Sequence, residues 1–154
     1  MKIEFELNGH RVAPEVEARM TLVDCIRHEL RQTGTHVGCE HGVCGACMVR
    51  LDGVAVRSCL LLAVQADGCR VETVEGLAQD GELNALQTAF RECHALQCGF
   101  CTPGMIMAIT GFLKDNPSPT DEEIIHGLEG NLCRCTGYVN IIKAVKQAAQ
   151  QMKS

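Results

Sequence analysis

The sequence predicts an α+β fold in which a small sheet packed on one helix is followed by an all-helical half. Polar and apolar residues alternate over residues 2–7, which is the pattern of a half-buried strand. The dipeptides Asn8-Gly9 and Asp52-Gly53 are typical of tight turns between hairpin strands. After about Gly76 only helical periodicity remains, so the chain changes structural class once along its length.

The first half is expected to contain a hairpin, a helix and three further strands. The second hairpin strand is predicted over residues 11–16. A helix is expected from the N-cap residue Thr21 to Gly34, because apolar residues recur every four positions between them. Strands over residues 48–51, 54–56 and 70–74 complete the predicted sheet.

The second half is expected to be a small helical bundle. Helices are predicted over residues 84–92, 103–114, 121–127 and 141–152. Asn116-Pro117 should end the second of these, and Thr120 with Glu123 has the spacing of a capping box at the start of the third. The change of texture near residues 76–83 predicts two domains, residues 1–78 and residues 79–154.

Composition excludes several classes of function. A net charge of −5 and the absence of tryptophan argue against nucleic acid as a partner. The longest apolar stretch, residues 59–64, is too short for a membrane span, and the first residues show no export signal, so a cytoplasmic location is expected. Eleven cysteines, an odd number, then favour metal ligation over a disulfide framework.

The first cysteine set has the C-x4-C-x2-C spacing of plant-type [2Fe-2S] ferredoxins, with a fourth thiol eleven residues further on. Its members are Cys39, Cys44, Cys47 and Cys59. Glycines lie among these ligands, where positive φ and close backbone approach let N–H groups point at the sulfurs; they are Gly38, Gly42 and Gly45. Zinc is the alternative, but structural zinc sites usually pair two short knuckles and this segment has one. Cys39 and His41 also match half of a Rieske site, but the other half is absent.

The second cysteine set is ambiguous from its spacing alone. It combines a C-x2-C and a C-x-C separated by 31 residues, and its members are Cys98, Cys101, Cys133 and Cys135. Four thiolates at one end of a helical bundle suit either [2Fe-2S] or zinc. A redox-active disulfide between Cys98 and Cys101 is a third possibility.

The motifs around the second set carry a specific resemblance. The segments LQCGFCTPGM and GNLCRCTGYVNI look like the signatures of the second [2Fe-2S] domain in the iron–sulfur subunit of the molybdenum hydroxylase (xanthine dehydrogenase) family. The resemblance covers essentially the whole chain. It implies an N-terminal β-grasp, plant-type ferredoxin domain and a C-terminal four-helix domain, each with one [2Fe-2S] cluster. It also implies that the second cluster lies beside the molybdenum cofactor.

The same resemblance gives Gln97 and Cys135 a role in cofactor binding. In that family, the Gln before the C-x2-C motif hydrogen-bonds the pterin of the molybdenum cofactor, and the last ligand cysteine also approaches the pterin. From the residues alone, Gln97 is more simply read as a helix-end amide that satisfies a backbone group. The remaining cysteines are assigned to packing; they are Cys25, Cys69 and Cys93. The role of Arg134, between two ligands, stays open.

As a function, the resemblance implies the electron-transfer subunit of a molybdenum-containing hydroxylase. Electrons would pass from a large molybdopterin-binding subunit through both clusters to FAD in a medium subunit, or to another acceptor. Substrate chemistry would lie in the partner, and the substrate would be an N-heteroaromatic compound or a purine. Alternatives are the small subunit of a carbon monoxide or aldehyde dehydrogenase, a freestanding ferredoxin-like carrier, and a zinc-stabilised interaction module.

Overall fold

The first half of the chain folds into a five-stranded mixed sheet in the computed structural model, which describes residues 1–152. The strands are β1 (Phe5–Leu7), β2 (His10–Val12), β3 (Met48–Leu51), β4 (Val54–Arg57) and β5 (Arg70–Glu72), in the order β2-β1-β5-β3-β4. β1 and β5 are parallel, whereas the other neighbouring strands are antiparallel. Positive φ at both residues of Asn8-Gly9 and of Asp52-Gly53 confirms the two predicted hairpin turns.

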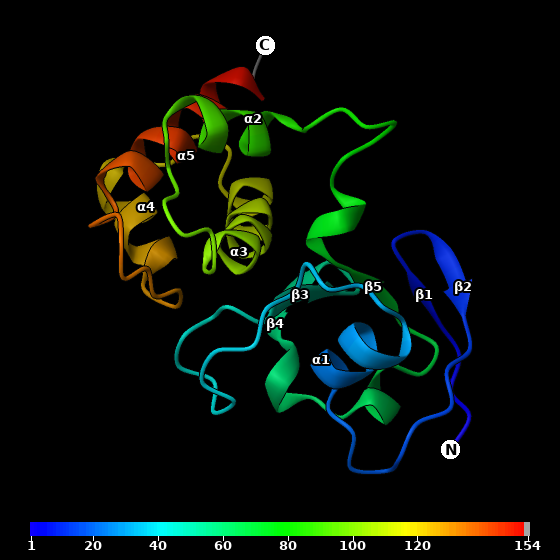
Figure 1. Ribbon diagram of the computed structural model, residues 1–154. Helices are drawn as coiled ribbons and strands as arrows, with labels where there is room; N and C mark the ends of the chain where they lie inside the picture. The colour runs from blue at the N-terminus through cyan, green and yellow to red at the C-terminus, as the bar shows by residue number, and fades with distance from the viewer. Residues whose placement is uncertain (153–154) are drawn as a thin grey trace.

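One helical segment packs on this sheet and completes the β-grasp fold (Figure 1). It starts as α1 (Leu22–Asp24) and continues as a π-helical turn, η1 (Cys25–Glu29). Thr21 is its N-cap, as predicted, because the Asp24 N–H donates to the Thr21 hydroxyl at 3.2 Å. Short 3-10 turns follow β4 and β5: η2 (Ser58–Leu60), η3 (Ala63–Ala66) and η4 (Val74–Gly76). The core between helix and sheet is formed mainly by Ile3, Phe5, Leu7, Val16, Leu22, Cys25, Ile26, Val49, Ala63, Ala66 and Val71.

Three predicted boundaries in this half are wrong by a few residues. The helix ends at Glu29 with Leu30 as its C-cap residue, because Arg31 takes a positive φ of 58° and stops it before Gly34. β2 ends at Val12 rather than residue 16, ahead of Pro14, which has no N–H to donate to a strand partner. β5 ends at Glu72, and the chain turns into η4 at Val74.

The second half contains the four predicted helices, each within two residues of its expected limits. They are α2 (Ala85–Glu92), α3 (Thr102–Asp115), α4 (Asp121–Leu128) and α5 (Val139–Gln151). The capping box of α4 is confirmed, with the Glu123 N–H donating to the Thr120 hydroxyl at 3.3 Å and the Thr120 N–H donating to the Glu123 carboxylate at 2.7 Å. The helical half therefore has the bundle architecture that its periodicity predicts.

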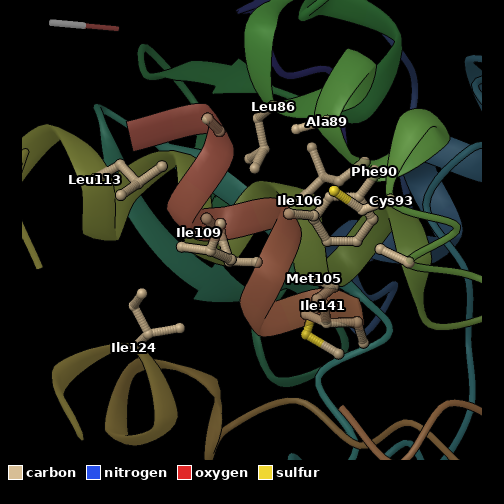
Figure 2. Close-up of a cluster of buried hydrophobic side chains, with 14 of the residues drawn as sticks. Leu86, Ala89, Phe90, Cys93, Met105, Ile106, Ile109, Leu113, Ile124 and Ile141 are labelled. Carbon is tan, nitrogen blue, oxygen red and sulfur yellow. The ribbon is translucent and has the colours of Figure 1, made fainter. Parts of the chain in front are cut away.

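The helical half has its own hydrophobic core, shown in Figure 2. Side chains from all four helices meet there, among them Leu86, Phe90, Met105, Ile106, Ile109, Leu113, Ile124, Ile141 and Val145. Cys93 belongs to this core and is 7% exposed, which agrees with its predicted packing role. Val74 and Leu77 are partly buried against the same cluster, so the chain begins to contact the helices just before it leaves the sheet half.

The two halves meet where α3 lies against β3 and β4 (Figure 1). Gly104, in the first turn of α3, allows this contact, because a Cβ there would lie 2.2 Å from the Gly45 carbonyl oxygen. Asn131, which is 4% exposed, reaches back from the helical half and donates to the same Gly45 carbonyl at 3.1 Å. The loop at residues 38–47, called the first ligand loop below because it contains three of the predicted ligands, is thus held directly against the second half.

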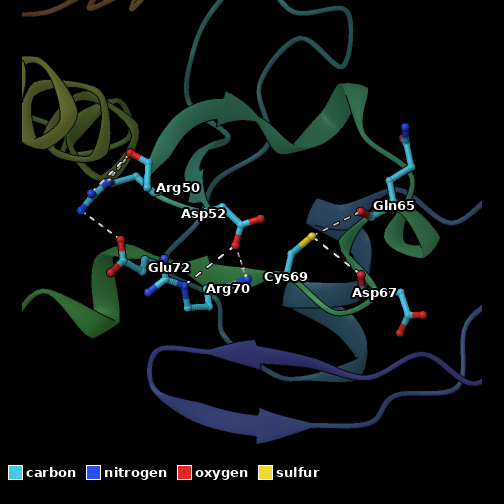
Figure 3. A network of polar contacts seen from close by, with 8 residues as sticks. Arg50, Asp52, Gln65, Asp67, Cys69, Arg70 and Glu72 are labelled. Carbon is cyan, nitrogen blue, oxygen red and sulfur yellow. Dashed lines mark hydrogen bonds and ion pairs between the residues drawn. The ribbon is translucent and has the colours of Figure 1, made fainter.

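Polar contacts at the edge of the sheet half show that Cys69 differs from the other non-ligand cysteines (Figure 3). Arg50 pairs with Glu72 at 2.9 Å, and the Arg70 N–H donates to Asp52 at 2.8 Å. Beside them the Cys69 thiol faces the carbonyl oxygens of Gln65 and Asp67 at 3.8 and 3.7 Å and is partly exposed. Cys69 is thus less buried than Cys25, which is fully buried, and its packing role stays a prediction.

Candidate metal centres

The first cysteine set lies on the irregular loop before β3 and on the turn after β4. Cys39 and Cys44 belong to the loop, Cys47 directly precedes β3, and Cys59 lies in η2. The backbone N–H groups of Val43 and Cys44 both donate to the Cys39 sulfur at 3.3 Å. The loop therefore directs N–H donors at a ligand sulfur, as the glycine pattern predicts.

Glycine is required in this loop for two different reasons. Gly42 and Gly45 have φ values of +83° and +73°, the left-handed region that side chains rarely adopt. Gly38 is needed for close approach, because a Cβ at that position would lie 2.9 Å from the Cys44 sulfur. A side chain at any of these positions would distort the surroundings of the thiols.

The four thiols of the first set occur as two contacting pairs. Cys39 interacts with Cys44, and Cys59 interacts with Cys47. N–H donors lower the pKa of Cys39 to about 6, with the Cys44 backbone contributing most. Burial, followed by the contact with Cys47, raises the pKa of Cys59 to about 11. Gathering these thiols as thiolates is therefore costly at Cys59 unless a cation binds there.

The second set also divides into two pairs, at the end of the helical half. Cys98 follows α2 and lies 3.5 Å from Cys135, sulfur to sulfur. Cys101 is the N-cap residue of α3 and interacts with Cys133 in the α4–α5 loop. All eleven cysteines are free thiols, and the observed pairs differ from the disulfide considered between Cys98 and Cys101.

The surroundings of these thiols shift their pKa values in opposite directions. The Phe100 N–H, followed by the Cys135 thiol, lowers the pKa of Cys98. Burial raises the pKa of Cys101 to about 12. Burial also acts to raise the pKa of Cys133, but the Thr136 hydroxyl, 3.0 Å from its sulfur, and nearby N–H groups outweigh burial and lower it. A bound metal would favour the thiolate at every one of these positions.

The paired arrangement fits a two-iron cluster at each site. In a [2Fe-2S] cluster with four cysteine ligands, each iron takes two thiolates. Two thiol pairs per site, with N–H and hydroxyl donors aimed at Cys39 and Cys133, therefore match the chemistry of an anionic iron–sulfur group.

Sequence reasoning missed Tyr138, which shapes the α4–α5 loop at residues 129–138. This loop contains Cys133 and Cys135 and is called the second ligand loop below. Tyr138 takes a positive φ of 68°, and its hydroxyl accepts from the Cys133 N–H at 2.8 Å while donating to the Asn131 carbonyl at 3.1 Å. Its own N–H donates to the Thr136 hydroxyl at 3.1 Å. The only signal in the sequence was that Thr136 and Tyr138 lie in the segment CRCTGY, directly after the last ligand.

A second contact that sequence reasoning missed joins the segment before the first ligand loop to the C-x2-C segment of the second site. The His36 ring stacks on Phe100 with a centroid separation of 4.8 Å, and its Nδ1 lies 2.8 Å from the Phe100 carbonyl oxygen. Phe100 lies between Cys98 and Cys101, and His36 lies three residues before Cys39. Their spacing of 64 residues along the chain gave no sign of the contact.

Gln97 and Cys135 lie together on the surface. Both side chains are exposed, and the Gln97 amide donates to the Cys135 carbonyl at 3.2 Å. This hydrogen bond is the backbone contact that the simpler interpretation of Gln97 anticipates. It also holds the amide at the outer edge of the second ligand loop.

Comparison with known proteins connects both sites to iron–sulfur chemistry. The family described as the 2Fe-2S iron-sulfur cluster binding domain matches residues 5–68, and the [2Fe-2S] binding domain matches residues 73–146. The nicotine 6-hydroxylase small subunit of Paenarthrobacter nicotinovorans is 55% identical, over 99% of this chain and 92% of that protein. The chain belongs to the family of small iron–sulfur subunits of molybdenum hydroxylases. The resemblance read from the motifs is confirmed.

Other members of the molybdenum hydroxylase family share the fold of the chain. The caffeine dehydrogenase subunit gamma of Pseudomonas sp. (strain CBB1) is 56% identical, over 96% of this chain and 90% of that subunit. In quinoline 2-oxidoreductase from Pseudomonas putida 86, a chain with 50% identity superposes with a TM-score of 0.97 and covers 99% of this chain and 96% of that one. Aldehyde oxidoreductase from Desulfovibrio gigas matches with a TM-score of 0.94 and 39% identity, covering 99% of this chain but 17% of that chain. The predicted fold class, a β-grasp domain followed by a helical [2Fe-2S] domain, is confirmed.

Proposed function

We propose that the chain binds one [2Fe-2S] cluster in each half and relays electrons between them. The first ligand set is Cys39, Cys44, Cys47 and Cys59, and the second is Cys98, Cys101, Cys133 and Cys135. The observation that carries this proposal is the gathering of the eight thiols at two sites, with N–H groups of Val43 and Cys44 donating to Cys39 at 3.3 Å in the first and Cys98 lying 3.5 Å from Cys135 in the second. At both sites the thiols interact in pairs. Each pair supplies the two thiolates that one iron requires.

A short backbone connection between the two ligand sets supports the relay. The Leu132 N–H donates to the Cys44 carbonyl at 2.9 Å, and Leu132 directly precedes Cys133. One hydrogen bond therefore joins a ligand residue of the first site to the neighbour of a ligand residue of the second. The buried Asn131 side chain holds the same loop in place.

We place the entry of electrons at the second site and their exit at the first. The second ligand loop is bordered by exposed apolar side chains, with Leu96, Phe100 and Leu132 being 39%, 48% and 52% exposed. A surface of this kind suits a permanent protein interface. We assign it to a large molybdopterin-binding subunit whose pterin meets Gln97 and Cys135. A medium FAD-binding subunit, or another acceptor, would take electrons from the first site.

We propose an N-heteroaromatic compound as the substrate of the assembled enzyme. Relatives that cover nearly the whole chain are named for nicotine and caffeine, and the matching solved structure is named for quinoline. An aldehyde is the alternative, since an aldehyde oxidoreductase subunit of Escherichia coli (strain K12) is 37% identical. Substrate binding and bond chemistry belong to the partner subunit in either case.

The domain boundary and the location of the protein are also proposals. We divide the chain into residues 1–78 and 79–154, which separates the two hydrophobic cores apart from the contacts of Val74 and Leu77. None of the helices within residues 1–152 has the length and apolar composition needed to cross a bilayer. We propose a cytoplasmic location because eleven free thiols persist in a reducing compartment.

Metal analysis and electron paramagnetic resonance (EPR) of the purified chain test the proposed function. About four iron and four acid-labile sulfide per chain are expected, because eight thiolates support two clusters. On reduction, two distinct EPR signals should appear, since N–H donors surround the first site and a helical pocket surrounds the second. Half of this iron content, or stoichiometric zinc, would contradict one cluster assignment. Purification of the native protein without a large subunit would support the freestanding carrier instead.

A further inference from the structure

Arg57 connects the first ligand loop to the helical half. It is the last residue of β4 and lies two positions before Cys59. Its side chain is half-buried, and Nη2 donates to the Gly130 carbonyl at 3.2 Å. Gly130 directly precedes Asn131 and Leu132, which contact the backbone of the first ligand loop. The guanidinium is therefore held between the two loops that the relay joins.

The Nε–H group of Arg57 is buried and has no hydrogen-bond partner within residues 1–152. A buried donor on a charged group is costly to leave unpaired, so such a group indicates a missing acceptor. The acceptor would lie beside the first ligand loop, because the Arg57 Cδ is 3.6 Å from the position of a Cβ on Gly42. Gly42 in turn directs its backbone N–H toward the Cys59 thiol.

We infer that Arg57 is a positioning residue that holds a fixed positive charge beside the first cluster and raises its reduction potential. The inference rests on the ligand assignment proposed above. In the relay one electron moves from the second cluster to the first, with no bond formed or broken and no proton transferred. Reduction adds one negative charge to the first site, and a guanidinium, which stays protonated, stabilises that state. The charge thereby favours electron transfer to the first cluster, from which electrons leave the chain.

Redox titration of the cluster-loaded full chain, followed by EPR, tests this role. Arg57→Met removes the charge and keeps the length of the side chain, whereas Arg57→Lys keeps the charge. Arg70→Met is the matched control, because Arg70 is an exposed arginine that pairs with Asp52 and its loss changes net charge equally. Iron content and absorbance of each variant show whether the first cluster is present.

We expect Arg57→Met to lower the reduced-to-oxidised ratio of the first cluster about tenfold at a fixed potential, which is a shift of about 59 mV for one electron. The second cluster should shift much less, and Arg57→Lys should retain most of the native potential. An unchanged first cluster, equal shifts of both clusters, or an equal shift in Arg70→Met would overturn the inference. A native chain without the first cluster would instead contradict the proposed ligand assignment.

If the Arg57→Met variant does not incorporate the first cluster, the native chain is measured instead. Arginine labelled with 15N in the guanidinium group is incorporated, and the reduced first cluster is examined by pulsed EPR. A weak nitrogen coupling is expected on the first cluster and should disappear in Arg57→Lys, which has no guanidinium. If the native first cluster shows no arginine coupling, the guanidinium is not beside it and the inference fails.

Discussion

Individual cysteines in this chain differ in the environment of their sulfur atoms. Burial raises the pKa of Cys25 to about 11, and this thiol is enclosed by apolar side chains of the first core. Cys39 has the opposite environment, with backbone N–H groups that lower its pKa to about 6. The Cys25 thiol is thus protonated at neutral pH, whereas N–H donors favour the thiolate form of Cys39, the form that binds metal.

Replacing one ligand should affect one cluster only. Cys44→Ser removes a thiolate from the first set, so its EPR signal and about half of the iron should be lost while the second signal persists. Cys69→Ser is the matched control, because the Cys69 thiol faces the carbonyl oxygens of Gln65 and Asp67 and belongs to neither ligand set. Loss of both signals from a Cys44→Ser protein that remains folded would contradict the independence of the two sites.

The Gln97 amide should matter for the assembled complex rather than for the isolated chain. Gln97→Ala removes the hydrogen bond to the Cys135 carbonyl and, as proposed, one partner of the pterin, at a cost of about 1–3 kcal/mol. Both clusters should remain, while reduction of the second cluster by substrate slows or molybdenum cofactor is lost. Rapid-freeze EPR measures that step, with Gln79→Ala in the exposed linker as the control. An unaltered rate with full cofactor content would leave Gln97 as an amide that satisfies only the Cys135 carbonyl.

At the scale of elements, two glycines of helix α3 differ in whether their surroundings leave space for a side chain. A Cβ on Gly104 would clash with the Gly45 carbonyl at 2.2 Å, whereas a Cβ on Gly111 would meet Ala55 at an ordinary 3.7 Å. We expect Gly104→Ala to destabilise the chain by about 1–3 kcal/mol through overpacking. Gly111→Ala should stabilise it by about 0.4–1 kcal/mol, because alanine restricts the unfolded chain. Chemical denaturation measures both, and equal effects would contradict the close contact between α3 and the ligand loop.

The elements themselves follow from local signals, and the misplaced boundaries have local causes. Asn8-Gly9 and the Thr120–Glu123 box act over a few residues, so the sequence is enough to place the first hairpin and the start of α4. The end of the first helix depends on Arg31, which takes a left-handed conformation without being glycine or asparagine. Intrinsic propensity favours Gly34 as the left-handed residue that ends the helix. In the structure the left-handed residue lies three positions earlier because of its tertiary context.

At the scale of the whole molecule, the side chain of Asn131 holds the two halves together. It is buried and donates to Gly45 from 86 residues away. Asn131→Ala should leave the Gly45 carbonyl without this partner and cost about 1–3 kcal/mol. Both clusters should form, but the magnetic interaction between them in the reduced state should weaken as the halves loosen. Asn140→Ala, which loses a bond within the helical half, is the control, and equal EPR spectra in both variants would contradict this role.

The sequence predicts which cysteines belong to each candidate site but not how they are arranged. Cysteine spacing identified the first set, and motif resemblance was needed to choose iron for the second. The pairing of Cys98 with Cys135, and of Arg57 with Gly130, depends on contacts between segments distant in sequence. Such contacts are set by how the two cores pack, which no local pattern encodes.

The parallel pairing of β1 with β5 also has a consequence for the order of events during synthesis. The sheet closes once residue 72 has been made, whereas the loop at residues 130–132 that covers the first ligand loop is translated much later. Ribosome-bound chains of increasing length, assayed for iron uptake, would record the interval between these two events. We expect chains that extend beyond residue 72 but lack the loop at residues 130–132 to take up iron already, because all four thiols of the first set precede residue 72.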